Sequence, residues 1–597
     1  MPPNSKSRRN RLLGRANKFA HGKRYDDALV EYKKALAFDP ELAEAWLGCG
    51  NVYAELGLLG EAISAFAKAL ALKSDLTEAL LGCANVLAKM RANNAAIEAY
   101  DHLLKIKCDF PEAWLGLANV FYSLARYEDA IAAYTKAKAG QHIPPYTQGA
   151  LLDSKMHICD WSDFHTDRLR LIASVNDGNL VADPFAFFNV SSLAADQLKC
   201  AELYSRNRFP PAAKPLWRGE RYSHDRIRIA YVSADLRDHA TSFLLAGVFE
   251  RHDKTMFETT AISLCRDNAS KMRKRLLRAF DRFIDVENQS DSEVANLMHG
   301  LEIDIAVDLM GHTAASRFGI FARRPAPIQV EFLGYPGTSG AQYIDYIVAD
   351  RFVLPEKKHC TEQIVYLPDT FQPNDTRRLI GSRVPSRSQA GLPEVGFVFC
   401  AMNNVRKITP IFFYCWMRLL RCVEGSVLWM SAPNATAESN LRREAEKRGV
   451  DPHRLIFASR LPYPDHLARL ALGGLFLDTF PFNGGTTASD ALWAGLPLIT
   501  CAGEGFASRM AGSLLLAAGL PELIVHSVEE YEGLALELAR NPLLLAITRD
   551  KLARNRNTCA LFNTDRFTRH IEAAYKMMCE RSRLGQPATC LSIEQLA

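Results

Sequence analysis

The sequence predicts an α-helical superhelix followed by two α/β lobes, each built around a doubly wound parallel sheet. Three observations lead to this prediction. Residues 10–140 repeat with a period of 34, which is typical of stacked helical hairpins. Residues 224–385 and 386–583 alternate short apolar runs with helical stretches, as βα units do. Between the apolar run 475–477 and a helical stretch lies a glycine-rich turn, the usual connection at a ligand-binding sheet edge.

Composition limits the class of protein. The 597 residues are enough for three or more domains, and 48% hydrophobic with 23% charged residues is typical of a soluble globular chain. The net charge is only +5, and part of it lies in a basic N-terminal stretch: Lys6, Arg8, Arg9, Arg11 and Arg15. We therefore expect no nucleic-acid surface, and residues 1–9 are expected to be a flexible basic tail.

The lack of a recognisable targeting signal and the pattern of cysteines both indicate the cytoplasm. No apolar segment of signal-peptide type follows the basic stretch, and no run of about 18 apolar residues occurs. The fourteen cysteines are scattered without a CxxC pair. Reduced core thiols in a cytoplasmic protein without a membrane span are expected.

The repeat array is expected over residues 10–143, with about four units. Large apolar, small and aromatic positions recur in register at Leu12, Trp46, Leu80 and Trp114, at Ala16, Gly50, Ala84 and Ala118, and at Tyr32, Phe66, Tyr100 and Tyr134. Two antiparallel helices per unit, with small residues where they cross, are typical of the tetratricopeptide repeat. Stacked units of this kind form a superhelix.

One recurring position is not needed for packing. Asparagines stand on the first helix of each unit, at Asn17, Asn51, Asn85 and Asn119. First helices line the concave face of such superhelices, and an amide offers a donor and an acceptor together. The row therefore predicts a site for the backbone of an extended protein or peptide acceptor. The alternative is that each amide only satisfies polar groups between neighbouring helices.

Residues 144–223 are expected to be a helical connector. Pro144 and Pro145 end the repeat period, and the stretches 161–175 and 194–206 have helical character. A first lobe then covers 224–385, a second lobe covers 386–583, and 584–597 form a tail. Two such sheets in tandem indicate a two-lobed enzyme whose ligand binds in the cleft between the lobes.

The stretch 473–497 carries the most informative local pattern. Asp478 ends the strand-like run 475–477, the turn 481–485 contains Gly484 and Gly485, and a helix is expected from Ala488 to Ala494. Thr486, Thr487 and Ser489 are residues of N-cap type. Free N–H groups at a helix start bind phosphate, and Asp490 could accept hydrogen bonds from a ribose. The alternative is an ordinary crossover with a capped helix.

Three longer motifs carry a family resemblance. RRPAPIQVEFLGYPGTSG (323–340), DALWAGLP (490–497) and GEGFASRMAGSLL (503–515) resemble the O-GlcNAc transferase family, in a bacterial-type, SPINDLY-like form. The resemblance extends from about residue 10 to about residue 580 and includes the repeat array with its asparagine row. It implies the two-lobed GT-B fold, a nucleotide-sugar donor and protein acceptors.

The resemblance also implies site residues. His239, in the context DHATS, matches the proposed catalytic base, Lys407 matches the lysine that neutralises the departing diphosphate, and His312 and His299 are further cleft candidates. The implied nucleotide-sugar contacts are Leu333, Gly334, Asn404, Tyr463, His466, Gly485, Thr486, Thr487 and Asp490. A histidine at a strand end is otherwise more often structural.

At two positions implied in donor binding, the sequence differs from the animal members of the family. Tyr463 stands where animal members have lysine, and Gly485 stands where they have histidine. The expected function is inverting, metal-independent transfer of GlcNAc from UDP-GlcNAc to Ser or Thr of proteins, with no Asp-x-Asp metal motif. The alternatives are the same fold with GDP-fucose or UDP-glucose, and a repeat scaffold carrying a vestigial transferase.

Overall fold

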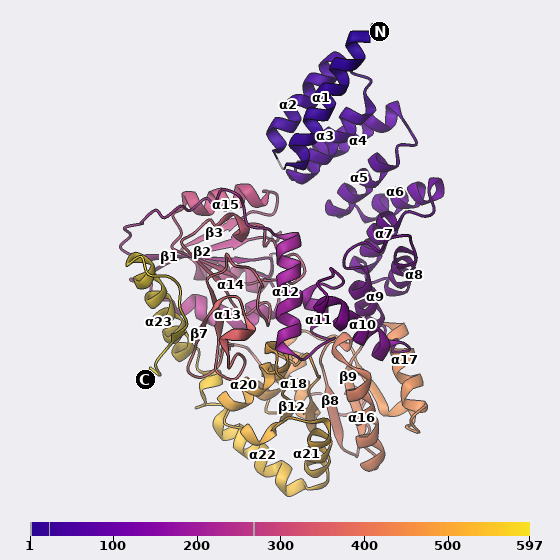
Figure 1. Cartoon of the computed structure of the whole chain (residues 1–597). Helices are drawn as coiled ribbons and strands as arrows, with labels where there is room; N and C mark the ends of the chain where they lie inside the picture. Colours follow the sequence, from indigo (N-terminus) through magenta and orange to yellow (C-terminus); the bar gives the residue numbers. More distant parts are fainter. Residues whose placement is uncertain (1–2, 23, 267–268, 597) are drawn as a thin grey trace. The chain divides into compact units, whose positions relative to one another are not determined.

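The computed structural model describes residues 3–22, 24–266 and 269–596, and the chain forms two compact units, residues 1–155 and 156–597. Figure 1 shows the first unit as a row of helical hairpins in indigo and purple. The second unit contains two parallel sheets covered by helices. The predicted order, a helical array followed by two α/β lobes, is confirmed.

The first unit consists of antiparallel helix pairs that repeat along the chain. Their members are α1 (Pro3–His21), α2 (Tyr25–Phe38), α3 (Ala43–Glu55), α4 (Leu59–Leu72), α5 (Thr77–Lys89), α6 (Asn93–Ile106), α7 (Pro111–Ser123) and α8 (Tyr127–Lys138). A Cβ on Gly50 would lie 2.6 Å from the Phe66 ring, and one on Gly116 would lie 2.4 Å from the Tyr100 hydroxyl. The small residues are therefore required where the helices cross.

The N-terminal stretch differs from the expected flexible tail. Helix α1 begins at Pro3, and the Arg9 guanidinium lies 3.1 Å from the Asp39 carboxylate at the end of α2. Residues 3–9 therefore continue the first helix of the array. Residues 1 and 2 lie outside the described residues.

Short helices connect the array to the sheets. They are α9 (Thr147–His157), α10 (Phe164–Asn176), α11 (Pro184–Phe187) and α12 (Ala194–Arg208). Helices were expected at 161–175 and 194–206, close to α10 and α12. Asp183 caps α11 by accepting hydrogen bonds from the N–H groups of Phe185 and Ala186, each at 3.0 Å.

The N-lobe sheet has eight parallel strands in the order β14-β7-β6-β5-β4-β1-β2-β3. The strands are β1 (Ile227–Ser233), β2 (Phe257–Ser263), β3 (Arg282–Asp285), β4 (Ile305–Asp308), β5 (Ile328–Glu331), β6 (Tyr346–Ala349), β7 (Gln363–Tyr366) and β14 (Leu591–Ser592). Helices α13 (Ala240–Arg251), α14 (Lys271–Ala279) and α15 (Asp291–Gly300) connect the first four strands. The β3 and β7 segments were not predicted; β3 carries charged residues at both ends, whereas β7 is apolar from Ile364 to Tyr366 and was missed.

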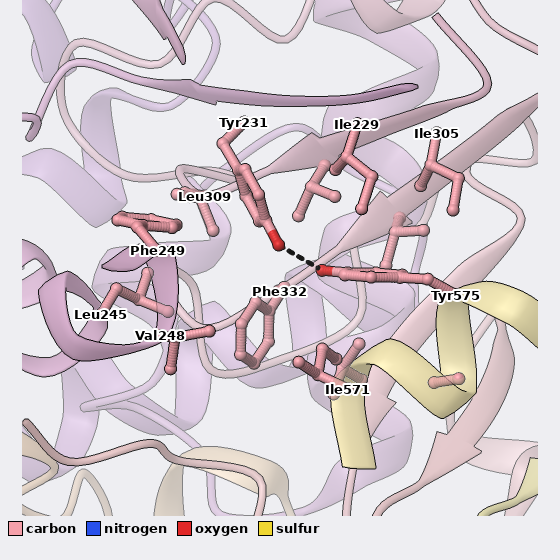
Figure 2. Close-up of a cluster of buried hydrophobic side chains, with 14 of the residues drawn as sticks. Ile229, Tyr231, Leu245, Val248, Phe249, Ile305, Leu309, Phe332, Ile571 and Tyr575 are labelled. Carbon is pink, nitrogen blue, oxygen red and sulfur yellow. Dashed lines mark hydrogen bonds between the residues drawn. The ribbon is translucent and has the colours of Figure 1, made fainter. Parts of the chain in front are cut away.

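The last part of the chain returns to the N-lobe. Ile571 and Tyr575 of α23 (Thr564–Arg583) pack in the same core as Ile229 and Phe332, and the hydroxyl groups of Tyr231 and Tyr575 hydrogen-bond at 3.2 Å (Figure 2). Strand β14 then joins the sheet beside β7. Residues 564–593 therefore belong to the N-lobe and not to the expected C-lobe and tail. An amphipathic pattern predicts a helix but does not indicate the sheet against which it packs.

The C-lobe sheet has six parallel strands in the order β10-β9-β8-β11-β12-β13. They are β8 (Val398–Ala401), β9 (Val427–Ser431), β10 (Leu455–Ala458), β11 (Leu475–Leu477), β12 (Leu498–Cys501) and β13 (Ile524–Val525). The helices are α16 (Pro410–Cys422), α17 (Ala435–Glu446), α18 (Tyr463–Arg469), α19 (Thr486–Trp493), α20 (Met510–Ala517), α21 (Val528–Arg540) and α22 (Pro542–Asn555).

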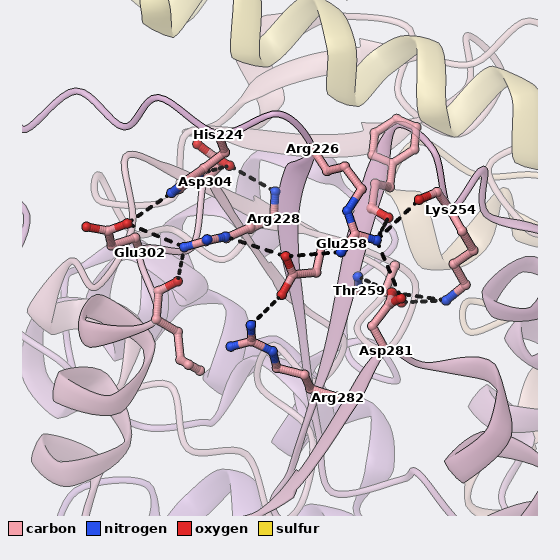
Figure 3. Close-up of polar contacts among 12 residues, drawn as sticks. His224, Arg226, Arg228, Lys254, Glu258, Thr259, Asp281, Arg282, Glu302 and Asp304 are labelled. Atoms are coloured by element: carbon pink, nitrogen blue, oxygen red, sulfur yellow. Dashed lines mark hydrogen bonds and ion pairs between the residues drawn. The ribbon is translucent and has the colours of Figure 1, made fainter.

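A polar network crosses the amino-terminal part of the N-lobe sheet (Figure 3). Glu258 of β2 lies 3.4 Å from Arg226 and 2.8 Å from Arg282, so one carboxylate joins the starts of β1, β2 and β3. His224 lies 3.0 Å from both Asp304 and Glu302, just before β4. The network holds the strands at the edge opposite to their carboxyl ends, where ligands bind in such sheets.

Candidate functional site

Each lobe has a topological switch point, and the predicted residues collect there. In the N-lobe the chain runs outward from β1 through β2 to β3 and then returns to place β4 on the other side of β1. In the C-lobe β11 likewise returns beside β8. Loops that follow the paired strands diverge at these points and leave a crevice. His239 and His312 follow β1 and β4, while Lys407 and Thr486 follow β8 and β11.

The loop between β11 and α19 is shaped by the buried carboxylate of Asp478. It accepts hydrogen bonds from the Gly484 N–H at 2.7 Å, the Asn403 amide at 2.9 Å and the Thr500 hydroxyl at 2.7 Å. Burial raises the pKa of Asp478 to about 6. A Cβ on Gly484 would lie 2.6 Å from the Thr487 hydroxyl oxygen, so a larger residue would displace that hydroxyl. Asp478 thus fixes the chain immediately before the helix start.

The start of α19 differs in detail from the prediction. Its N-cap is Gly485, Thr486 is the first helical residue, and no side chain caps the helix. The helix begins two residues earlier than Ala488, so Thr486 and Thr487 lie in its first turn. The N–H groups of that turn are left for a ligand, and the helix dipole adds partial positive charge. The Thr487 hydroxyl donates to the Asn403 side-chain oxygen.

Lys407 lies beside this helix start. It belongs to the short 3-10 helix η4 (Val405–Lys407), which Asn404 caps by accepting a hydrogen bond from the Arg406 N–H at 3.1 Å. The Lys407 ammonium donates to the Asn483 carbonyl at 2.8 Å and lies 3.6 Å from the centre of the Phe482 ring. Burial lowers the pKa of Lys407 to about 7, which the nearby Asp478 partly opposes. The structure therefore supplies an ammonium and free helical N–H groups at one place.

Asp490 has a partner that the sequence did not indicate. Its Oδ1 accepts hydrogen bonds from the Arg378 guanidinium at 2.7 Å and from the Tyr463 hydroxyl at 2.6 Å. Arg378 also donates to Asn374 Oδ1 at 2.9 Å. Burial raises the pKa of Asp490, and Arg378 opposes this shift. Arg378 lies in a polar stretch between the lobes, where no local motif distinguishes it from its neighbour Arg377.

Tyr463 joins this cluster to the N-lobe. Its ring stacks on that of Phe243 in α13, with ring centres 4.3 Å apart and an angle of 6° between the planes. His239 caps the same helix four residues earlier, so it lies one turn from Phe243 on the same face. His466, one turn after Tyr463, accepts a hydrogen bond from Arg469 at 2.8 Å, and burial lowers its pKa to about 4.

His239 is paired with Asp235, a residue that the sequence analysis did not select. The His239 Nδ1 lies 3.3 Å from Asp235 Oδ2 and 3.4 Å from the Thr241 N–H. Burial lowers the pKa of His239 and raises that of Asp235, and each opposes the shift of the other. The imidazole, 41% exposed as a side chain, is therefore held uncharged and accessible.

Leu333 and Gly334 form a tight turn after β5. Leu333 has a left-handed backbone with φ of 68°, and a Cβ on Gly334 would lie 1.8 Å from the Leu309 carbonyl oxygen. The turn is thus pressed against the carboxyl end of β4, next to the loop that contains His312. Glycine is required at 334 by this close approach.

The two other histidine candidates occupy different places. His312 is buried among aromatic rings, and its Nε2 lies 2.7 Å from the Ser339 carbonyl oxygen, to which it donates. Burial lowers its pKa to about 4. His299 was expected near the cleft, but it ends α15 immediately before β4 and therefore lies at the opposite edge of the sheet. His299 precedes this strand in the sequence, so its place at the amino end of the strand was readable from the chain order.

The asparagine row lies in the first unit, and its amides have defined partners. All four side chains are exposed. The Oδ1 atoms of three of them accept hydrogen bonds from tyrosine hydroxyls of the second helix: Asn17 from Tyr32 at 2.6 Å, Asn85 from Tyr100 at 2.5 Å and Asn119 from Tyr134 at 2.7 Å. For Asn51 the residue at the corresponding position is Phe66, which has no hydroxyl group to donate. Within the described part of the chain, the Nδ2 groups of these asparagines have no hydrogen-bond partner and remain for another acceptor.

Two features are absent from the described residues, 3–22, 24–266 and 269–596. No helix there is long and apolar enough to cross a membrane. The same residues contain no group of three or more His, Cys, Asp or Glu side chains arranged to hold a metal ion.

Comparisons with known proteins agree with this architecture. Residues 214–383 and 376–571 match Glycosyl transferase family 41, and residues 16–57, 43–76 and 83–142 match tetratricopeptide repeats. The family matches span more than half of the sequence, so the chain belongs to glycosyl transferase family 41. Helical repeats joined to two parallel-sheet lobes are thus the architecture of a glycosyltransferase of this family.

Several relatives are named for one reaction. The chain is 37% identical over 417 residues to a probable UDP-N-acetylglucosamine–peptide N-acetylglucosaminyltransferase, SEC, of Arabidopsis thaliana, covering 68% of this chain and 42% of the relative. It is 26% identical over 564 residues to the transferase of that name from Caenorhabditis elegans, covering 72% and 48%. A SPINDLY protein of Solanum lycopersicum is 30% identical over 376 residues, covering 61% and 40%. The chain thus spans less than half the length of these relatives.

One solved structure matches almost the whole chain. It is a mutant of the O-GlcNAc transferase of Thermobaculum terrenum, with a TM-score of 0.58 and 27% sequence identity. The match covers 98% of this chain and 100% of the other.

Proposed function

We propose that this chain is a protein O-glycosyltransferase that transfers GlcNAc from UDP-GlcNAc to Ser or Thr of protein acceptors, with inversion and without a metal ion. The observation that carries the proposal is the pairing of Lys407 with the uncapped start of α19 at the C-lobe switch point. Relatives named as UDP-N-acetylglucosamine–peptide transferases support the choice of donor and acceptor.

The leaving diphosphate is the first requirement of the reaction. As the bond from the anomeric carbon to the diphosphate oxygen breaks, its electron pair leaves with UDP and negative charge grows on the phosphates. The Lys407 ammonium and the N–H groups at Thr486 and Thr487 are fixed in place before this charge develops. Preorganised donors of this kind stabilise a transition state without reorganisation.

The acceptor proton is the second requirement. The acceptor hydroxyl oxygen forms the new bond to the anomeric carbon, and its proton must pass to a base. We assign this role to the Nε2 of His239 in the tautomer that carries its proton on Nδ1. That proton is directed at Asp235, 3.3 Å away, and takes the place of the contact from the Thr241 N–H at 3.4 Å. A burial-lowered pKa keeps the imidazole neutral and able to accept the proton. His312, which the resemblance also implied, has Nε2 engaged by a carbonyl and is assigned a positioning role.

The nucleotide is proposed to occupy the space around Tyr463, His466 and Asp490. The Asp490 Oδ1 is already used by Arg378 and Tyr463, so its Oδ2 is proposed to accept from the ribose hydroxyls. Asn404, Gly485, Leu333 and Gly334 complete the proposed donor site. Gly485 leaves room there that a larger side chain would fill.

Protein acceptors are proposed to bind along the asparagine row of the first unit. The exposed Asn17, Asn51, Asn85 and Asn119 offer amide N–H donors at regular intervals, which suits the evenly spaced carbonyls of an extended chain. We also propose a cytoplasmic location, in keeping with fourteen free cysteines, a pattern that is common in reducing compartments.

A donor panel tests the proposal. The purified full chain is incubated with UDP-GlcNAc, GDP-fucose or UDP-glucose and an acceptor peptide, and product is measured by mass spectrometry. Turnover of UDP-GlcNAc well above that of the other donors is expected. Preference for GDP-fucose would assign the other donor, and binding of peptides without turnover of any donor would favour a scaffold.

A further inference from the structure

A basic hollow lies on the N-lobe outside the proposed donor site. Its volume is about 490 Å³, and six basic side chains line it together with Glu250 and Ala279: Lys254, Lys271, Lys274, Arg275, Arg278 and Arg377. Helix α14 contributes most of them, α13 contributes Glu250, and Arg377 comes from the segment between the lobes. We refer to this feature as the α14 hollow.

The charges of the α14 hollow do not balance. Arg275 lies 2.7 Å from Glu250 and 2.5 Å from Asp375. Arg377 shares Glu250 at 3.1 Å. Lys254 lies 3.1 Å from Asp281, and Figure 3 shows this second pair. The six cationic side chains of the hollow thus have only three carboxylates as ion-pair partners. Among the described residues, no ion-pair partner is recorded for the other three cations, which are all exposed: Lys271, Lys274 and Arg278.

The unpaired cations form a line. Lys271, Lys274 and Arg278 stand at positions i, i+3 and i+7 of α14, so they share one face over about 10 Å of helix. Three residues of an extended peptide cover about the same length. Ala279 is the apolar residue of the lining, and no aromatic ring is part of it. Such a surface suits a ligand whose binding groups are carboxylates along a chain.

One end of the line is next to the proposed base. The N–H of Met272, the second residue of α14, donates to the Asp238 carboxylate at 3.3 Å, and Asp238 directly precedes His239. At the other side, Arg377 directly precedes Arg378, which holds Asp490. A chain lying along α14 therefore leads toward the place where the acceptor hydroxyl must react.

We propose that the α14 hollow binds an acidic segment of the protein acceptor, close in sequence to the Ser or Thr that is modified. This inference rests on the proposed function, because the acceptor must be a polypeptide. The three unpaired cations attract the acidic side chains, and Arg275 and Arg377, held by Glu250, border the bound segment. Screened surface pairs of this kind are individually weak, so the selectivity depends on several acting together.

The test compares two peptides that differ only in charge. Each has one Thr; one carries four Asp or Glu residues within six positions of it, and the other has Asn and Gln at these positions. Each peptide is made in two versions, one with these four residues before the Thr and one with them after it. Initial rates with UDP-GlcNAc and fluorescence anisotropy of labelled peptides are measured at low salt with the full chain.

The acidic peptide should show a KM about tenfold lower than its neutral match, with a similar kcat, and the advantage should vanish in 0.5 M salt, roughly the range in which the Debye length falls to a few Å. The variant Lys271→Ala/Lys274→Ala should remove the advantage while leaving turnover of the neutral peptide unchanged. The control Arg421→Ala/Arg554→Ala removes two exposed charges from the C-lobe, away from the α14 hollow, and should keep the advantage.

Each other outcome has a definite meaning. Equal KM values for both peptides, or equal losses in the control variant, would overturn the inference while transfer itself confirms the proposed function. If neither peptide is modified, the proposed function fails, and anisotropy still decides whether Lys271 and Lys274 bind the acidic peptide. If the protein sediments with phosphatidylserine vesicles but does not bind the acidic peptide, the hollow is a membrane-binding site and the inference is overturned.

Discussion

Asp490 holds the guanidinium of Arg378 at 2.7 Å, and the two side chains are only 6% and 2% exposed. Tyr463 donates to the same carboxylate oxygen at 2.6 Å. The pair joins α19, which begins at the proposed phosphate site, to the segment between the lobes. Asp490 therefore has a structural task in addition to the ribose contact proposed for its second oxygen.

Replacing Asp490 should reduce stability more than the ribose contact alone implies. Asp490→Ala leaves the buried Arg378 without its counter-charge, which typically costs about 3–5 kcal/mol. Asp490→Ala/Arg378→Met should recover part of the loss, because no unpaired charge stays buried. Denaturant unfolding measures stability and calorimetric titration measures UDP affinity. A fully stable Asp490→Ala protein would contradict the importance of the pair.

The sequence could predict the part of this site that is local. A strand, a glycine-rich turn and a helix start are consecutive between 475 and 493, so the position of Thr486 follows from nearest neighbours. Arg378 is 112 residues from Asp490. The contact between Arg378 and Asp490 depends on how the two lobes pack around the segment that contains Arg378. Neither residue spacing nor composition predicts this packing.

The pH dependence of kcat/KM should be bell-shaped. Lys407 must be protonated to stabilise the diphosphate, so activity should fall as pH rises through its pKa of about 7. His239 must be neutral, so activity should also fall as pH drops through its pKa, which burial places below the ordinary value. Lys407→Arg, which stays charged, should lose the alkaline limb. An unchanged limb in this variant would assign it to another group.

Chelation should not reduce the rate. The Lys407 ammonium and the start of α19 already face the proposed position of the diphosphate, which is the place where a metal would act. Initial rates with UDP-GlcNAc are compared with and without EDTA, and with added manganese or magnesium. Inhibition by EDTA that manganese or magnesium reverses would contradict this account of the leaving group.

Variants in the asparagine row can distinguish a role in acceptor binding from a role in packing. Asn51→Ala removes an exposed amide whose counterpart on the second helix is Phe66 instead of tyrosine, so stability should change by less than about 0.5 kcal/mol. Asn119→Ala removes the acceptor of the buried Tyr134 hydroxyl, which should cost about 1 kcal/mol or more. The two variants form a matched pair, measured by thermal unfolding.

The triple variant Asn51→Ala/Asn85→Ala/Asn119→Ala should then lose glycosylation of protein acceptors while still hydrolysing UDP-GlcNAc. Each lost amide donor should weaken acceptor binding by about 0.5–1.5 kcal/mol, the net contribution of one hydrogen bond. Circular dichroism verifies that the array is folded. A folded triple variant with wild-type rates on protein acceptors would make the row purely structural.

The same contrast between local and distant information applies to the rest of the fold. The 34-residue period predicted the repeats because each hairpin packs against its neighbours in sequence. The return of α23 to the N-lobe, where Tyr575 meets Tyr231, joins positions 344 residues apart. The tyrosine partners of Asn17, Asn85 and Asn119 lie 15 residues away at a constant spacing and were in principle readable from the aligned repeats.

The central claim is that Lys407 and the start of α19 expel a nucleoside diphosphate from a sugar that is delivered to protein. The direct measurement is single-turnover transfer from UDP-GlcNAc to a protein acceptor, followed by intact mass, for the wild type and for Lys407→Ala. The wild type should add one N-acetylhexosamine, and Lys407→Ala should be about 10²–10³ slower with its fold intact. No mass increase with the wild type, or equal rates in the two proteins, would contradict the account.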